Sequence, residues 1–205
     1  MNNLRKFANT ADYEAATLSR PAVSLIETSG KIKFDPDTYH GIVRVYYNIA
    51  DASQEVVLYN AGSSSGSESG SESGSGQAGA TPSAMWVDGN EEVVISTHRF
   101  NEAGLHYVDY DFEVPTIPED TFENNNLVTK VVVADAVTAI GSGVFRSCAN
   151  LVEVVSKPTT PPNLADGTIF SGHSNDLVIY VPADAVNTYK EANRWSNYAS
   201  IIQAM

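Results

Sequence analysis

Residues 107–114 alternate strictly between polar and apolar side chains. The apolar positions are Val108, Tyr110, Phe112 and Val114, and the other face carries Tyr107, Asp109, Asp111 and Glu113. Because successive side chains of a strand point to opposite sides, this pattern predicts a half-buried β-strand with an acidic outer face.

Shorter apolar and alternating runs predict further strands on both sides of the polar segment 61–80. Upstream strands are expected at 22–27, 31–35, 42–49 and 56–59. A short helix is expected between Thr10, a plausible N-cap, and Pro21. Downstream, the runs 84–87 and 92–96 flank Asp88-Gly89, which is a strong β-hairpin signal.

Apolar residues beyond Pro115 recur at a fixed offset of 23 positions. The matching pairs are Ile117 and Ile140, Phe122 and Phe145, Val128 and Leu151, and Val131 and Val154. A longer copy follows, because Phe145 to Phe170 spans 25 positions. The period is typical of leucine-rich repeats, which bury their apolar faces only when neighbours stack. We therefore expect a short leucine-rich-repeat solenoid over 116–182 and a C-terminal helical cap over 183–205.

Residues 61–80 read AGSSSGSESGSESGSGQAGA, with no apolar side chain other than Ala. This composition predicts a flexible Gly/Ser linker with an end-to-end distance of roughly 25 Å. It separates an N-terminal anchoring or assembly unit over 1–60 from a β-hairpin module over 81–115, which precedes the repeats. The predicted fold class is mainly β (α+β): a small N-terminal β unit with a short helix, the linker, the hairpin module, the solenoid and its cap.

Charge and cysteine content narrow the range of functions. The 205 residues include 12 Lys and Arg against 25 Asp and Glu, which gives a net charge of −13. Nucleic acids and anionic membranes both require clustered cations, so neither is expected as a partner. No apolar run is long enough for a spanning helix, and the first thirty residues lack a signal peptide. Cys148 is the single cysteine, so a reducing compartment, or a particle assembled in one, is the expected setting.

Candidate catalytic and metal-binding residues lack a supporting pattern. Cys148 as a nucleophile would need an adjacent histidine, whereas its repeat position explains it as a small buried hydrophobe. The histidines show no metal-ligand spacing; they are His40, His98, His106 and His173. No catalytic, cofactor-binding or metal-binding residue is predicted, and we expect the chain not to be an enzyme.

One cation site stays open as an alternative, formed by Asp109, Asp111 and Glu113. Same-face positions along a strand lie about 7 Å apart, so a Ca²⁺ ion there would need further ligands from a loop. The favoured interpretation is a solvated strand face.

The aromatic residues indicate a surface for recognition. Phe122, Phe145 and Phe170 are assigned to the repeat core, and several others are assigned to the cap. The candidates that remain for contact with a sugar or a protein are Tyr46, Tyr47, Trp86 and Tyr107.

The stretch VTKVVVADAVTAIGSGVFRSCANLVEVV places Ala136-Val137-Thr138, Ile140-Gly141, Phe145, Cys148 and Leu151 on the marked positions of a known pattern. It resembles the BspA-like leucine-rich repeat, although Ala134-Asp135 stands where that family has Ile-Pro and Val144 replaces its Ala. The ending LVIYVPADAVNTYKEANRWSNYASIIQAM is similar to the terminal cap of such proteins from gut anaerobes.

The segment NLRKFANTADYEAATLSRPAVSLIETSGKIKFDP resembles the N-terminus of structural proteins from tailed phages of gut bacteria, including crAss-like phages. This resemblance implies a non-enzymatic virion protein, such as a capsid fibre, a decoration protein or a tail-associated adhesin. Its N-terminal unit would bind other virion proteins, and its repeats would be displayed toward a host-surface protein or glycan. The trimeric habit of phage fibres favours a homo-oligomer, with a trimer preferred.

Two alternatives belong to other functional classes. A bacterial leucine-rich-repeat surface adhesin would need an export signal or an anchor. A hydrolase bound to the particle would need a catalytic cluster.

Overall fold

The computed structural model describes residues 25–28, 31–34, 40–61 and 81–205, and it divides the chain into two units, Met1–Thr38 and Tyr39–Met205. In the first unit, β1 (Leu25–Thr28) and β2 (Lys31–Phe34) pair as an antiparallel hairpin in which Leu25 lies opposite Phe34. The helix expected between Thr10 and Pro21 lies outside the described residues. The chain is mainly β.

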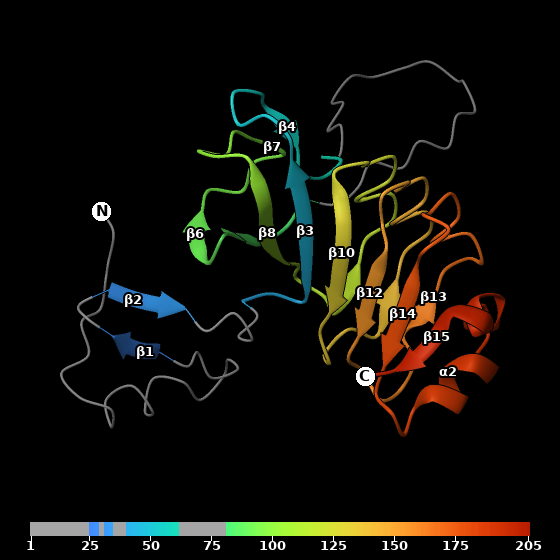
Figure 1. Ribbon diagram of the computed structural model, residues 1–205. Coiled ribbons are helices and arrows are strands. Elements are labelled where there is room, and N and C mark those ends of the chain that lie inside the picture. The colour runs from blue at the N-terminus through green and yellow to red at the C-terminus, as the bar shows by residue number, and fades with distance from the viewer. Residues whose placement is uncertain (1–24, 29–30, 35–39, 62–80) are drawn as a thin grey trace, which may run out of the picture. The chain divides into compact units, whose positions relative to one another are not determined.

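The second unit is built around an eight-stranded sheet with the order β15-β14-β12-β10-β3-β8-β5-β6 (Figure 1). Its strands are β3 (Val43–Ile49), β5 (Ala84–Val87), β6 (Asn90–Glu92), β8 (Gly104–Asp111), β10 (Val128–Val133), β12 (Glu153–Ser156), β14 (Val178–Val181) and β15 (Ile202–Ala204). The half from β6 to β10 is antiparallel, and the half from β10 to β15 is parallel.

A three-stranded parallel sheet accompanies the parallel half. It consists of β9 (Thr116–Ile117), β11 (Ala139–Ile140) and β13 (Asn163–Leu164), in the order β13-β11-β9. A further short antiparallel pair joins β4 (Val56–Val57) to β7 (Thr97–His98).

Residues 23 positions apart lie side by side in both parallel ladders. Val131 lies opposite Val154, and Ile117 lies opposite Ile140. Between the ladders, the ring of Phe145 stacks between those of Phe122 and Phe170, with centroids 5.5 and 5.7 Å away and interplanar angles of 4° and 0°. All three rings are buried, so each turn of chain rests on its neighbours through a shared aromatic column.

The C-terminal residues cover the last ring of this column. The helix α2 (Val186–Glu191), a 3-10 helix over Trp195–Ile201 and the strand β15 follow one another, so the expected all-helical cap over 183–205 is wrong at its end. Trp195 and Tyr198 both contact Phe170, at centroid distances of 6.1 and 5.3 Å. Parallel pairing with β14 makes the final residues a strand, which local periodicity could not indicate.

The predicted boundary at residue 60 is wrong, because β3 lies between β8 and β10 in the centre of the large sheet. Val43, Val45, Tyr47 and Ile49 are buried there. Both strands that pair with β3 follow the polar segment, and short-range patterns carry no information about such distant pairing. Segment 61–80 therefore begins and ends within one unit, and it is not a tether between two bodies.

Candidate functional site

Three of the four aromatic candidates lie on one side of the large sheet, which we call the aromatic face. It carries Trp86 on β5, Tyr107 on β8 and Tyr46 on β3, all partly buried. Strand register sets this arrangement, since Tyr46 lies opposite Tyr107 and Trp86 lies opposite Asp109. The side chains of cross-strand partners lie on the same side of a sheet, so the register assembles a continuous surface from three strands.

Tyr47 lies on the opposite side of the sheet and is fully buried. Its hydroxyl donates a hydrogen bond to the Leu58 carbonyl at 2.7 Å and lies 2.6 Å from the Tyr110 hydroxyl. Burial raises the pKa of Tyr47 well above its ordinary value. The assignment of Tyr47 to a recognition surface is wrong, because neighbouring residues of a strand point to opposite faces.

A buried ion pair lies at the centre of the aromatic face. Arg44 donates from Nε to Asp109 Oδ1 at 2.6 Å and from Nη2 to Asp109 Oδ2 at 2.8 Å, and the two side chains are 1% and 0% exposed. The His40 backbone N–H also donates to Asp109, at 3.3 Å. Burial alone would lower the pKa of Arg44, but the hydrogen bonds and charge of Asp109 hold it above its ordinary value. The guanidinium is therefore charged and held in a bidentate geometry.

The expectation of a solvated acidic strand face is wrong for Asp109, which is buried and paired. Asp111 ends β8 and is only partly buried, and the exposed Val114 lies beyond the strand. Within the residues that the structure describes, no group of three His, Cys, Asp or Glu side chains is placed to hold a metal ion. Both Asp109 oxygens accept bonds from Arg44, so the register that buries this carboxylate also gives it a cationic partner.

The three partly buried aromatic rings each contact another side chain on the same face of the sheet. The Arg44 guanidinium carbon lies 4.1 Å from the Tyr107 ring centroid, and His40 stacks on Trp86 at 5.4 Å. Lys130 Nζ lies 5.5 Å from the centre of the Tyr46 ring. Each ring is therefore contacted by a side chain of the same face, and each remains partly accessible to solvent.

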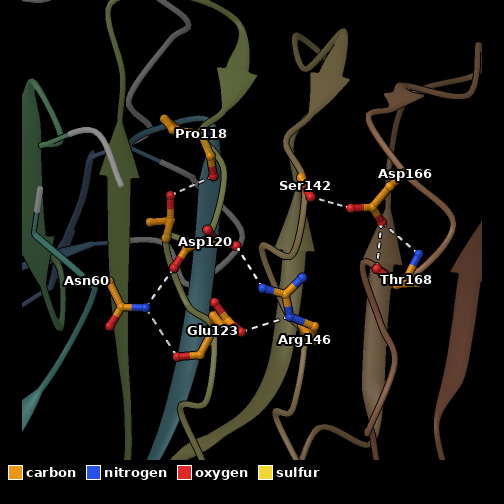
Figure 2. Close-up of polar contacts among 9 residues, drawn as sticks. Asn60, Pro118, Asp120, Glu123, Ser142, Arg146, Asp166 and Thr168 are labelled. Carbon is orange, nitrogen blue, oxygen red and sulfur yellow. Dashed lines mark hydrogen bonds and ion pairs between the residues drawn. The ribbon is translucent and has the colours of Figure 1, made fainter. Parts of the chain in front are cut away.

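A second polar cluster joins the loops that follow β9, β11 and β13 (Figure 2). Arg146 Nε donates to Glu123 Oε1 at 2.7 Å, and its Nη2 lies 3.3 Å from Asp120 Oδ1. In the next loop, Ser142 donates to Asp166, which also accepts bonds from the Thr168 N–H and hydroxyl at 2.6 and 2.9 Å. We call this cluster the loop ladder, because the pairs made by Arg146 and Ser142 join consecutive turns of chain.

Electrostatics in the loop ladder follow from these pairs. Burial raises the pKa of Asp120, and the charge of Glu123 adds to this effect while Arg146 opposes it. Burial would also raise the pKa of Asp166, but the hydrogen bonds from Ser142 and Thr168 bring it below its ordinary value. The hydrogen bond to Glu123 raises the pKa of Arg146. Arg146 is thus the cation of the loop ladder for Asp120 and Glu123, and Asp166 is held by hydrogen bonds from Ser142 and Thr168.

The sequence itself contains a signal for this cluster. Glu123 and Arg146 are 23 positions apart, so the offset that aligns the apolar pairs also places these opposite charges on neighbouring turns. Asn126 shows the same relation, because its Oδ1 accepts from the N–H of Ala149, again 23 positions further on.

Cys148 and His106 are both held by hydrogen bonds to neighbouring residues. Cys148 is fully buried and donates to the Phe122 carbonyl at 3.1 Å, and burial raises its pKa to about 12. His106 lies between the Asp88 carboxylate and the Glu102 carbonyl, at 2.7 and 3.0 Å. A thiol with so high a pKa is a poor nucleophile at neutral pH.

Comparison with known proteins gave no match to a family model and none to a curated protein. Within the described part of the chain, no helix has the length and apolar character needed to cross a membrane.

Proposed function

We propose that this chain is a non-enzymatic structural protein of a phage virion, on the capsid or the tail. Its N-terminal unit attaches to other virion proteins, and the body over Tyr39–Met205 is displayed at the particle surface as a short leucine-rich-repeat solenoid. Binding of a host-surface protein or glycan is assigned to the aromatic face.

The solenoid interpretation is supported by the parallel ladders. Successive turns of chain present Phe122, Phe145 and Phe170 to one column, and the strands on either side pair in register. Repeats of this kind contact mainly their neighbours, so the body is stabilised turn by turn.

The observation that carries the proposed function is a set of ion pairs that join adjacent strands or turns of the body. Arg146 joins Glu123 and Asp120 to the following turn, and Lys130 Nζ lies 2.8 Å from Glu153 Oε1 on the neighbouring strand. Arg44 is bound in the same way to Asp109. The buried pair of Arg44 and Asp109 joins β3 to β8 beneath the aromatic face, and this supports a role for that face in binding.

Many copies on one particle would compensate for weak binding by each. A distal module held at high local concentration gains avidity without any new contact. The partly buried rings of Trp86, Tyr107 and Tyr46 offer a contact area on one face of the sheet for such a weak interaction.

The proposal is tested on intact particles. Density-purified virions from an infected culture are analysed by mass spectrometry, and an antibody raised against the body is used for immunogold labelling. We expect peptides of this chain at a constant ratio to the major capsid protein, and gold at the particle surface. Recovery of the chain only from the envelope of uninfected bacteria would overturn the proposal and favour the surface adhesin.

Oligomerisation is measured separately on the purified chain. Light scattering is expected to give a homo-oligomer, with a trimer favoured. A strict monomer over the whole concentration range would contradict this part of the proposal.

A further inference from the structure

The central strand β3 is bonded along both of its edges by strands from beyond the polar segment. All of its residues, Val43–Ile49, pair with β8, and β10 pairs with its other edge. On its inner side, Val45 and Tyr47 are fully buried. This strand therefore fills a groove between β8 and β10 whose walls both come from residues 104–133.

Residues 58–60 extend this interface to the first turn of the parallel half. Leu58 and Tyr59 are buried, and the Asn60 N–H donates to the Thr121 carbonyl at 2.8 Å. Asn60 Nδ2 also donates to the carbonyls of Asp120 and Glu123, at 2.7 and 3.2 Å (Figure 2). These bonds satisfy backbone groups that the preceding turn of a solenoid would otherwise satisfy.

The geometry of Asn60 resembles that between later turns. Asp120 N donates to the Ser142 carbonyl at 2.8 Å, and Phe122 N donates to the Val144 carbonyl at 3.0 Å. Residues 58–60 thus make the hydrogen bonds that a preceding turn of chain would make. They cover the first turn of the parallel half, whereas α2 and β15 cover the last.

All the contacts above join residues 40–61 directly to residues 81–205, and Ala61 and Thr81 belong to the same unit. The segment between these two residues contributes no apolar side chain larger than Ala. The interface thus has the features of a strand–groove complex: main-chain pairing for affinity, and buried alternate side chains for specificity.

We propose that the groove between β8 and β10 is a strand-binding interface whose partner is residues 40–61 of this chain, and that the covalent connection through 62–80 is dispensable once the strand is bound. A chain cut in this segment stays assembled, so proteolysis there does not release the body from the N-terminal unit. This inference does not depend on the proposed virion function.

The test uses the full-length chain with a site-specific protease sequence inserted between Gly70 and Ser71. After cleavage, the sample is passed over a sizing column at micromolar concentration in native buffer, and its circular dichroism and melting curve are compared with those of the uncut chain. We expect both fragments in one peak, with the folded signal retained, and their separation only in concentrated urea. Separation in native buffer, or loss of the folded signal on cutting, would overturn the proposal.

Two aspartate substitutions on β3 distinguish binding of this strand in the groove from non-specific association of the fragments. Val45→Asp places a charge on the buried side of β3, and Asn48→Asp places the same charge on the exposed side. In the cut chain, Val45→Asp is expected to release the N-terminal fragment, whereas Asn48→Asp is expected to retain it. Equal retention of both would contradict binding in the groove.

A milder variant decides the matter where Val45→Asp prevents folding of the uncut chain. Tyr47→Phe removes the hydroxyl that lies against Leu58 and Tyr110 but keeps the ring. Exchange of the bound fragment with a fluorescently labelled copy is expected to become roughly tenfold faster, the effect of losing about one buried hydrogen bond. An unchanged exchange rate would contradict the placement of the Tyr47 hydroxyl against Tyr110 at the interface between the two fragments.

Discussion

The ion pair between Arg44 and Asp109 allows a quantitative prediction about the sheet that carries the aromatic face. Two hydrogen bonds of 2.6 and 2.8 Å join side chains that are 1% and 0% exposed, so the pair belongs to the buried class. Removing one partner leaves an uncompensated charge in the protein, which costs about 3–5 kcal/mol. Arg44→Met and Asp109→Leu are each expected to lower the free energy of unfolding by about this amount.

The double variant is expected to behave differently from the sum of the two changes. With both charges replaced by apolar groups of similar volume, no unpaired charge remains, so the loss should be less than about 1 kcal/mol, or stability should even increase. The predicted coupling is therefore several kcal/mol, which is far above the values for pairs exposed to solvent.

The assay is urea unfolding followed by tryptophan fluorescence and by circular dichroism, with the four proteins of the cycle compared at pH 7. Lys130 and Glu153 provide the matched control, because their side chains are 35% and 33% exposed and their pair should contribute about 0–1 kcal/mol. Single variants of Arg44 or Asp109 that cost less than about 1 kcal/mol, or that add linearly in the double variant, would refute the reasoning.

Three further predictions concern the parallel half. Phe145→Ala removes the middle ring of the aromatic column and should cost about 3–5 kcal/mol in urea unfolding, with Phe145→Leu clearly less harmful; equal costs would argue against a packed column. Because the pKa of Asp166 is lowered in the folded state, its contribution to stability is present above the unfolded value and is lost as the pH falls through the folded value. Ser142→Ala should therefore be less stable than the wild type at pH 7 and approach it well below pH 3.8, and a pH-independent difference in unfolding free energy would contradict this. Cys148, buried with a pKa near 12, should react with a thiol reagent only upon unfolding, so rapid labelling of the native chain at pH 7 would contradict its placement.

Local patterns predicted the strands well where one face is buried. The alternation around Val108 and Tyr110 corresponds to β8, which buries both side chains. The hairpin at Asp88-Gly89 joins β5 to β6, although β6 spans Asn90–Glu92 and not the expected 92–96. Asp88 and Gly89 both adopt a positive φ, 48° and 82°, as the tight turn between these strands requires.

The same local patterns failed where the decisive neighbour is distant in the chain. Asp109 was expected in solvent because it shares a face with Asp111, yet it lies opposite Arg44, 65 positions away, and is buried with it. Tyr47 was expected at the surface, yet its hydroxyl bonds Leu58 and Tyr110 in the core. In both cases the pairing of β3 with β8 decides the environment.

The candidate surface was predicted in composition but not in arrangement. Tyr46, Trp86 and Tyr107 could be selected because no repeat or cap position accounts for them. Their placement on one face, and their contacts with Lys130, Arg44 and His40, follow only from strand register.

By itself, the sequence determined the strands that bury one face, such as β8, the offset of 23 that places residues of successive turns side by side, and an excess of acidic charge. These properties depend on residues within one strand or one turn of chain, whose spacing can be read directly. Only the tertiary structure decided that β3 completes the sheet from the far side of a polar segment, and therefore which charges are buried and where one unit ends. Pairing between distant strands depends on the burial and hydrogen bonding of the whole sheet. A short stretch of residues cannot indicate it, because the partners lie elsewhere in the chain.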